Sequence, residues 1–226
     1  MNKIWDKIAN LAQHIEHKFK ETGYKEPTNT HDYNWYNSIY SSMRYRRAHI
    51  EIVDNRESHG IYILHTTIFP HFNDRSPIWG FDAICGQNKI TGAFHDLSPA
   101  GDASHQMIKW FGARTANLKW NKPRDLPQWA KEIFSSNMVA AGNIQDAEEL
   151  TELSKLVLDS LDYYMEHVGY TQQSGSDYHM AQNRYCYYQK QNPQVVKSMV
   201  SMGVPEPVIT KFVDEILFPE TVNIRL

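Results

Sequence analysis

The sequence predicts an α/β fold of the α+β kind, in which helices pack on a central, mainly antiparallel sheet. Four segments with strand patterns follow one another between residues 45 and 96. The links between them are short and rich in Asn, Gly, Asp and Pro, which is typical of hairpins between antiparallel neighbours. Helical patterns lie before and after this run, so helices can cover the sheet.

An amphipathic helix is predicted over residues 4–20, near the beginning of the chain. Its apolar residues recur at helical spacing: Ile4, Ile8, Leu11, Ile15 and Phe19. A polar, turn-rich stretch from Gly23 to Asn37 follows, and no element is predicted within it.

The four predicted strands are Tyr45–Val53, Ile61–Phe69, Ile78–Cys85 and Ile90–Asp96. The first alternates cleanly, and the second is rich in β-branched residues and stops at Pro70. The third lies between Pro77 and Gly86. The fourth stops before a Ser-Pro turn, and we expect Asp96 to be solvated there.

The second half of the chain is mostly helical in its pattern. Gly101–Pro127 is loop-like with some helical character, and Phe134–Ala140 is a candidate fifth strand. The strongest helix is predicted at Gln145–His167, with Asn143 as its cap. A polar loop, Gly169–Ser176, separates it from three further helical segments, at about 178–190, 194–202 and 206–218.

Length and composition favour one domain over residues 1–226. The net charge of −3 argues against a nucleic-acid-binding protein. No apolar run is long enough for a membrane span, and the N-terminus lacks a signal-peptide core, so we expect a cytoplasmic protein. The two cysteines, Cys85 and Cys186, form no metal or redox motif, which predicts free buried thiols in a reducing compartment.

Titratable residues gather on one face of the predicted sheet. The two-residue period places Arg47, His49 and Glu51 together, opposite the apolar residues of their strand. If the first three strands are neighbours, His65 and Asp82 join the same cluster. Burial disfavours the charged carboxylate, so the pKa of Asp82 is expected to rise toward the range of a useful acid.

Other interpretations of this cluster stay open. A lone His or Asp in a strand is often only a hydrogen-bonded structural residue. Two histidines and two carboxylates (His49, Glu51, His65 and Asp82) could instead bind zinc or iron. Two basic groups, Arg44, Arg46 and Arg47 in one and Lys122 and Arg124 in the other, could attract an acidic partner or simply be solvated.

From Arg46 onward the sequence resembles the ferredoxin-dependent bilin reductases. The resemblance is carried by short motifs in a specific order and spacing: Arg46-Arg47-Ala48-His49-Ile50-Glu51, Ile63-Leu64-His65, Ile68-Phe69-Pro70, Pro77-Ile78-Trp79-Gly80-Phe81-Asp82, Asp96-Leu97-Ser98-Pro99, Phe134-Ser135-Ser136-Asn137, Asn192-Pro193 and Ile216-Leu217-Phe218. It implies a three-layer α/β/α sandwich, with biliverdin IXα held between the sheet and the C-terminal helices. It also implies no bound cofactor, because reduced [2Fe–2S] ferredoxin would deliver single electrons through radical intermediates.

The resemblance also implies residue roles. Asp82 would be the central proton donor, His65 its partner, and Glu51 the acid that serves the D-ring vinyl group. His49 would be hydrogen-bonded toward His65. Thr91 falls where a hydroxyl holds a propionate.

A four-electron conversion to phycocyanobilin is the product that the resemblance favours. Asn192 stands where a phycoerythrobilin-forming relative has Asp. Basic residues that usually meet the propionates are missing near Ala141 and Pro193, so Arg47, Lys197 or Arg184 would have to substitute. Formation of phycoerythrobilin therefore stays an alternative, as do a metal-dependent enzyme and a non-catalytic tetrapyrrole carrier. We expect a monomer in the cytoplasm of a cyanobacterium or of a phage-infected host cell.

Overall fold

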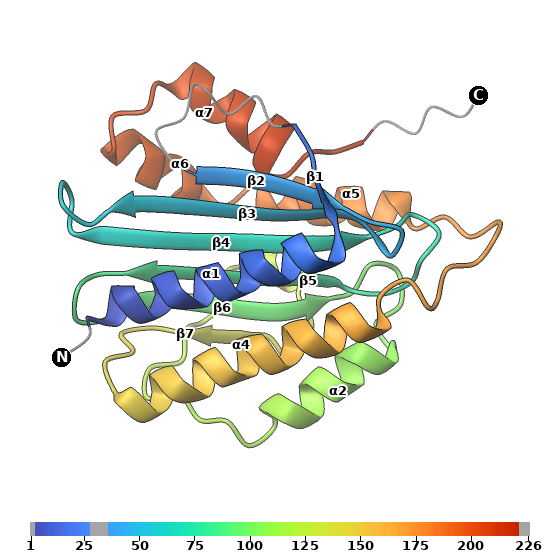
Figure 1. Ribbon diagram of the computed structural model, residues 1–226, viewed down its shortest axis with the longest axis horizontal. Coiled ribbons are helices and arrows are strands. Elements are labelled where there is room, and N and C mark those ends of the chain that lie inside the picture. Colours follow the sequence, from blue (N-terminus) through green and yellow to red (C-terminus); the bar gives the residue numbers. More distant parts are fainter. Residues whose placement is uncertain (1–2, 28–35, 222–226) are drawn as a thin grey trace.

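The computed structural model describes residues 3–27 and 36–221. Its centre is a seven-stranded sheet in which every strand pairs antiparallel with its neighbour in the chain, so the order is β1 to β7 (Figure 1). The strands are Tyr24–Lys25, Tyr36–Ser41, Tyr45–Asn55, Ile61–Pro70, Ile78–Cys85, Ile90–Ser98 and Val139–Ala141. The predicted antiparallel sheet is confirmed.

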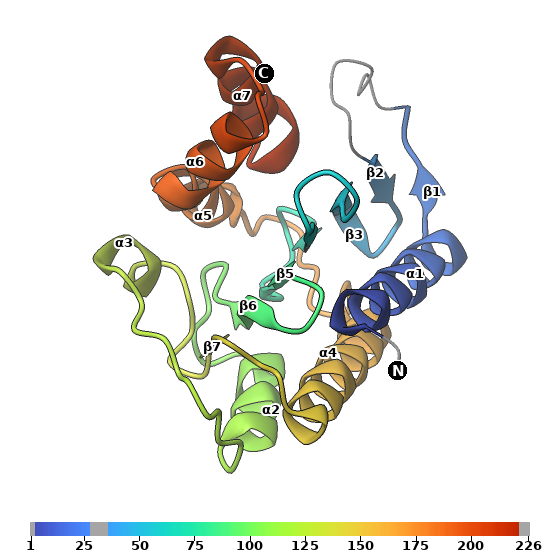
Figure 2. The same ribbon diagram turned by 90° about the vertical axis from the view of Figure 1, so that its left-hand side faces the viewer.

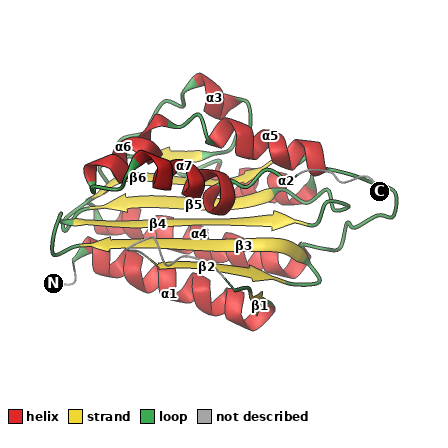
Figure 3. Cartoon of the chain, turned by 90° about the horizontal axis from the view of Figure 1, so that it is seen from above, coloured by secondary structure: helices red, strands yellow, loops and turns green. Residues whose placement is uncertain are grey.

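Helices cover both faces of this sheet, which confirms the three-layer sandwich (Figures 2 and 3). One layer contains α1 (Ile4–Thr22), α2 (Gln106–Thr115) and α4 (Ala147–His167). The other contains α3 (Gln128–Lys131), α5 (His179–Gln189), α6 (Pro193–Ser201) and α7 (Glu206–Phe212). The last of these continues into a π-helical turn, η1 (Val213–Leu217).

The two faces of the sheet differ because side chains alternate along each strand. Ala48, Ile50, Leu64 and Phe81 are buried in the larger core, which also contains the apolar stripes of α1 and α4. The opposite face presents the polar side chains of the same strands to the C-terminal helices. A smaller core there, around Tyr185 and neighbouring helical residues, leaves space beside it.

Four central strands and the helices at 4–20, 178–190, 194–202 and 206–218 appear where the sequence predicts them. The strands β1 and β2 were not predicted, and the turn-rich stretch expected at Gly23–Asn37 lies partly outside the described residues. The candidate fifth strand is shorter, because only Val139–Ala141 pairs with β6.

The cap of α4 also differs from the prediction. Asp146, not Asn143, accepts hydrogen bonds from the backbone N–H groups of Glu148 and Glu149. Asn143 instead takes a positive φ of 52° before the helix. Among residues 3–27 and 36–221, no helix is both long and apolar enough to cross a membrane.

Candidate active site

Three titratable residues lie opposite one another on adjacent strands. The register of β3 with β4 pairs Glu51 with His65, and that of β4 with β5 pairs His65 with Asp82. All three side chains point to the face covered by the C-terminal helices, because they occupy equivalent positions of the pleat. The clustering predicted from alternation is therefore confirmed.

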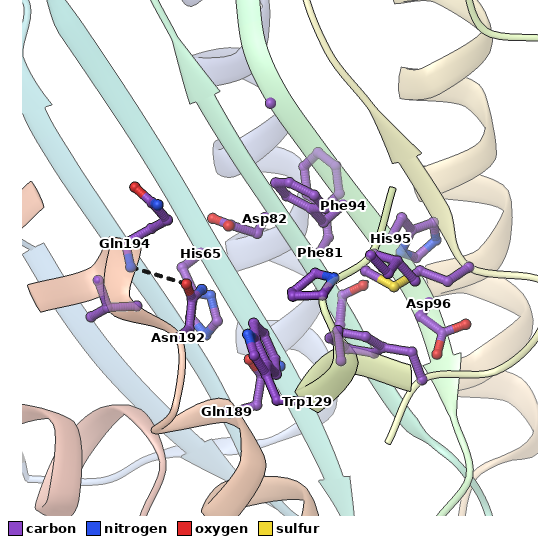
Figure 4. A pocket seen from close by; sticks show the side chains of 18 of the residues that line it. His65, Phe81, Asp82, Phe94, His95, Asp96, Trp129, Gln189, Asn192 and Gln194 are labelled. Atoms are coloured by element: carbon purple, nitrogen blue, oxygen red, sulfur yellow. Dashed lines mark hydrogen bonds between the residues drawn. The ribbon is translucent and has the colours of Figure 1, made fainter. Parts of the chain in front are cut away.

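A cavity of about 760 Å³ lies over this part of the sheet (Figure 4). Its floor includes His65 and Asp82, and its walls include Phe94 of β6, Trp129 of α3 and residues at the beginning of α6. The size is within the range of about 300–1,000 Å³ that is typical of pockets for small organic ligands. Aromatic walls with a few polar groups suit a large, flat ligand.

Burial sets the protonation of the cluster. It raises the pKa of Asp82 to about 7. Burial, together with the charge of Asp82, raises the pKa of Glu51 to about 8. Burial disfavours imidazolium, so it lowers the pKa of His65 to about 4. At neutral pH the site therefore holds exchangeable protons on carboxylic acids beside a neutral imidazole.

The family model described as ferredoxin-dependent bilin reductase matches residues 2–219. The chain belongs to this family. The protein is therefore an oxidoreductase. A cavity lined by Asp82, whose pKa is raised to about 7, agrees with this activity.

Individual relatives agree with this membership. A phycocyanobilin:ferredoxin oxidoreductase of Synechococcus sp. (strain CC9605) is 29% identical over 189 residues, which are 80% of this chain and 74% of that protein. Another, of Prochlorococcus marinus, is 27% identical over 208 residues, 88% of this chain and 81% of that one.

Two solved structures share the fold of the reductase. A structure of PcyX covers 95% of this chain and 99% of that chain, with a TM-score of 0.69 and 22% identity. Phytochromobilin synthase from tomato, solved in complex with biliverdin, has the same TM-score at 14% identity and covers 95% of this chain and 82% of its own.

The predicted residues occupy different places relative to the cavity. Asp82, His65, Thr91 and Asn192 line it, whereas Glu51, His49 and Arg47 do not. The hydroxyl of Thr91 donates to the carbonyl of Ile84 at 2.9 Å. The side chain of Asn192 caps α6 by accepting from the backbone N–H of Gln194 at 3.0 Å.

Arg47 lies beside the C-terminal helices. Its guanidinium donates to the carbonyl of Ile216 in η1, and the turn is followed by Phe218. The ring of Phe218 meets that of His65 edge-on, with centroids 5.6 Å apart. Phe218 lines the cavity together with residues of β4, whereas Glu51 and the other residues of β3 do not line it.

Arg124, which the sequence places only in a basic pair with Lys122, is a residue of the site. It lines the cavity, its guanidinium stands 5.9 Å from the ring centre of Phe94, and it donates to the carbonyl of Thr91. The sequence contains no local pattern that predicts this position, because Arg124 lies in an irregular segment. Only the packing of that segment against the sheet brings Arg124 to the cavity.

The prediction that Asp96 is solvated was wrong. Asp96 is 1% exposed and accepts hydrogen bonds from the hydroxyls of Ser98 and Ser135 and from the backbone N–H of Ser135. Burial raises its pKa to about 6, although these hydrogen bonds oppose the rise. The turn that contains Ser135 packs against the end of β6 and excludes solvent from Asp96.

Of the first predicted basic group, Arg44 is exposed, whereas Arg46 and Arg47 contact the C-terminal helices. The guanidinium of Arg46 is enclosed by the rings of Phe69 and Phe72 and donates to Gln182 at 2.6 Å. Arg47 is equally committed to η1. Both arginines hold the sheet to the C-terminal helices instead.

The cysteine prediction is confirmed, since Cys85 and Cys186 are both free and buried.

Within the described part of the chain, no group of three or more His, Cys, Asp or Glu side chains is arranged to hold a metal ion.

Proposed function

We propose that this reductase converts biliverdin IXα to phycocyanobilin with four electrons taken one at a time from reduced [2Fe–2S] ferredoxin. One observation carries the proposal: Asp82 and His65, paired across β4 and β5, open together on a cavity of about 760 Å³. The solved tomato relative in complex with biliverdin supports the choice of ligand. The relatives named phycocyanobilin:ferredoxin oxidoreductase support the choice of product.

Asp82 is the proposed central proton donor. With its pKa raised to about 7, the carboxyl group holds a proton in about half of the molecules at pH 7 and can both give up and regain it there. Each electron that enters a conjugated bilin makes the bilin more basic, so a proton held beside it is transferred at that moment. Over the whole reaction four electrons and four protons enter the ligand.

His65 and Glu51 complete the proposed proton supply. His65 is neutral, so it accepts a hydrogen bond at one ring nitrogen and donates at the other. Glu51 is also protonated at neutral pH, with a pKa near 8, and would serve the D-ring vinyl group. We propose no bound organic cofactor, because the conjugated ligand itself delocalises an unpaired electron.

Arg124 is the proposed partner of a bilin propionate. It is the one arginine among the cavity-lining residues of the described chain, and it lies beside Thr91, whose hydroxyl donates to the carbonyl of Ile84. A guanidinium fits a carboxylate in geometry and charge. The bilin would then lie over Phe94 with its reacting rings toward His65 and Asp82.

Phycoerythrobilin is a second candidate product, and one observation favours it. Glu51 does not line the cavity, although its register partner His65 does. If the D-ring vinyl group does not reach Glu51 in the complex, the four electrons would reduce other bonds of the bilin, and the product would be the isomer phycoerythrobilin.

An anaerobic assay with biliverdin and reduced ferredoxin tests the function, with products separated by chromatography. We expect consumption of biliverdin only when ferredoxin is reduced, with phycocyanobilin as the product. In Glu51→Gln the vinyl group should remain unreduced while other steps continue. Binding without any ferredoxin-dependent change would indicate a carrier instead. Stoichiometric zinc or iron in the purified protein would indicate a metal enzyme if His65→Ala lost both the metal and the activity.

A further inference from the structure

The polar row on the sheet continues one strand beyond Glu51. Asn37 of β2 is the register partner of Glu51, so Asn37, Glu51, His65 and Asp82 stand in line across four strands. Asn37 is 5% exposed. A buried amide in a strand is costly unless it is hydrogen-bonded, so its partner is informative.

That partner is His49. The side-chain oxygen Oδ1 of Asn37 lies 2.9 Å from Nε2 of His49. An amide oxygen only accepts hydrogen bonds, so Nε2 must carry the proton. Burial and the nearby charge of Arg47 lower the pKa of His49 well below its ordinary value, so the ring is neutral. Its other nitrogen, Nδ1, therefore carries no hydrogen and can only accept one.

Two neighbouring ring nitrogens have no hydrogen-bond partner among the described residues. Nδ1 of His49 and Nε2 of His65 are both buried and unpaired. The two rings are 6.1 Å apart between centroids. Unpaired buried polar atoms cost about 1–3 kcal/mol each, so a matched pair at an active site calls for a functional explanation.

We propose that Asn37 is a positioning residue that holds His49 in the Nε2–H tautomer and so leaves Nδ1 as an acceptor that Nε2–H of His65 can reach through one bridging water. With its proton fixed on Nε2, His65 would have its Nδ1 as the acceptor beside Asp82. The proton that Asp82 or the ligand exchanges with His65 would then move at one defined atom. This inference rests on the proposed function, because it assigns the direction of proton movement at that same site.

The tautomer can be read directly by ¹⁵N NMR of histidine-labelled protein without biliverdin. We expect the Nε2–H form of His49 in the wild type, a mixture of tautomers in Asn37→Ala, and the Nε2–H form again in Asn37→Asp at a pH of about 9, where the new carboxyl group is ionised and only accepts hydrogen bonds. Ser38→Ala is the matched control, because it removes a buried, unpaired hydroxyl from the next position of β2. Its His49 spectrum should equal that of the wild type.

A single-turnover reduction of bound biliverdin tests the consequence. Asn37→Ala should bind biliverdin within about threefold of the wild type but reduce it at least tenfold more slowly, whereas Asn37→Asp and Ser38→Ala should stay close to the wild type. An unchanged tautomer in Asn37→Ala overturns the proposal, and so does a shifted tautomer with an unchanged rate. If Asn37→Ala fails to fold, the tautomer of His49 in Asn37→Asp decides. The Nδ1–H form of His49 in that variant overturns the proposal, and the Nε2–H form supports it.

The two readouts separate this inference from the proposed function. If wild-type protein binds but never reduces biliverdin, the function fails while the NMR result still decides whether Asn37 sets the tautomer. If reduction proceeds and the tautomer does not depend on Asn37, only the inference fails.

Discussion

A carboxylic acid that titrates near neutral pH is the central feature at the scale of single residues. Asp82 stands on a strand whose other residues are mostly apolar, and its side chain faces the cavity rather than bulk water. Desolvation by burial accounts for its raised pKa. The same residue would be a costly defect in a protein that did not need a proton there.

Asp82→Asn should therefore separate binding from chemistry. The amide keeps the shape of the side chain, so we expect biliverdin affinity within about threefold of the wild type. Turnover should fall by about 10²–10⁴, the usual contribution of a positioned proton donor. Asp125→Asn is the control, because Asp125 also lines the cavity but is solvent-exposed. Equal turnover of Asp82→Asn and the control would contradict the assigned role.

Glu51 makes stability depend on pH. Its pKa is about 8 in the folded protein against an ordinary 4.5, so between these values the folded state binds more protons than the unfolded state. The contribution of Glu51 to the free energy of unfolding is then fully present below pH 4.5 and is lost as the pH rises through 8.

Glu51→Gln should remove this fall. We expect the free energy of unfolding of the variant, measured relative to that of the wild type, to be at least ~1 kcal/mol higher at pH 9 than at pH 5, because one unit of pKa corresponds to about 1.4 kcal/mol. Urea denaturation at pH 5 and at pH 9 measures this difference. Glu57→Gln, in an exposed turn, should show no such gain. A parallel pH dependence of Glu51→Gln and wild type would show that Glu51 ionises normally in the folded state.

At the scale of elements, the π-helical turn η1 leads directly into Phe218, which lines the cavity. A π-turn leaves backbone carbonyls in unusual positions, and π-turns often occur at functional sites. Arg47 of β3 donates to the carbonyl of Ile216 in this turn. Immediately after the turn, Phe218 lies against His65. One strand thereby fixes the helical segment that closes the active site.

Arg47→Met should loosen this closure. A hydrogen bond from a charged group contributes about 1.5–3 kcal/mol, and this one is partly buried, so the free energy of unfolding should fall by up to that amount. Biliverdin affinity should fall as well, because Phe218 is no longer held. Arg47→Lys, which keeps the charge and one donor, should lose less in both measurements. If Arg47→Met lowers stability but leaves affinity unchanged, η1 does not control the cavity.

The elements themselves were largely predictable. Strict alternation in Tyr45–Val53 fixed which face each side chain of β3 takes, and helical spacing fixed α1 and α4. β2 escaped prediction because Asn37 and Ser38, in its centre, are polar residues typical of turns, although both are buried. Asn143 was the wrong cap because Asn and Asp are equivalent as caps, and backbone geometry chooses between them.

At the scale of the whole molecule, the cavity is formed by segments far apart in the sequence. The floor comes from β4–β6, one wall from the segment that carries Arg124 and Trp129, and another from α5 and α6 (Figures 2 and 4). The helices on the opposite face, α1, α2 and α4, contribute a core rather than a site.

Arg124→Gln tests whether this assembly recognises a carboxylate. We expect biliverdin to bind at least ~tenfold more weakly, since a charge-assisted contact contributes about 1.5–3 kcal/mol. The affinity for biliverdin dimethyl ester should stay unchanged, because the ester lacks the anion. Lys122→Gln removes an exposed cation two positions away and should affect neither ligand. A similar loss for both ligands in Arg124→Gln would indicate a packing role only.

The sequence by itself determined the four central strands, the faces of their side chains and the meeting of Glu51, His65 and Asp82, because alternation and short links act locally. Only the tertiary structure decided that Asp96 is dry, that Arg46 and Arg47 are committed to the C-terminal helices, and that Arg124 and Asn37 belong with the site. The reason is physical: a local pattern fixes the direction of a side chain, but its burial and partners depend on which distant segments pack over it.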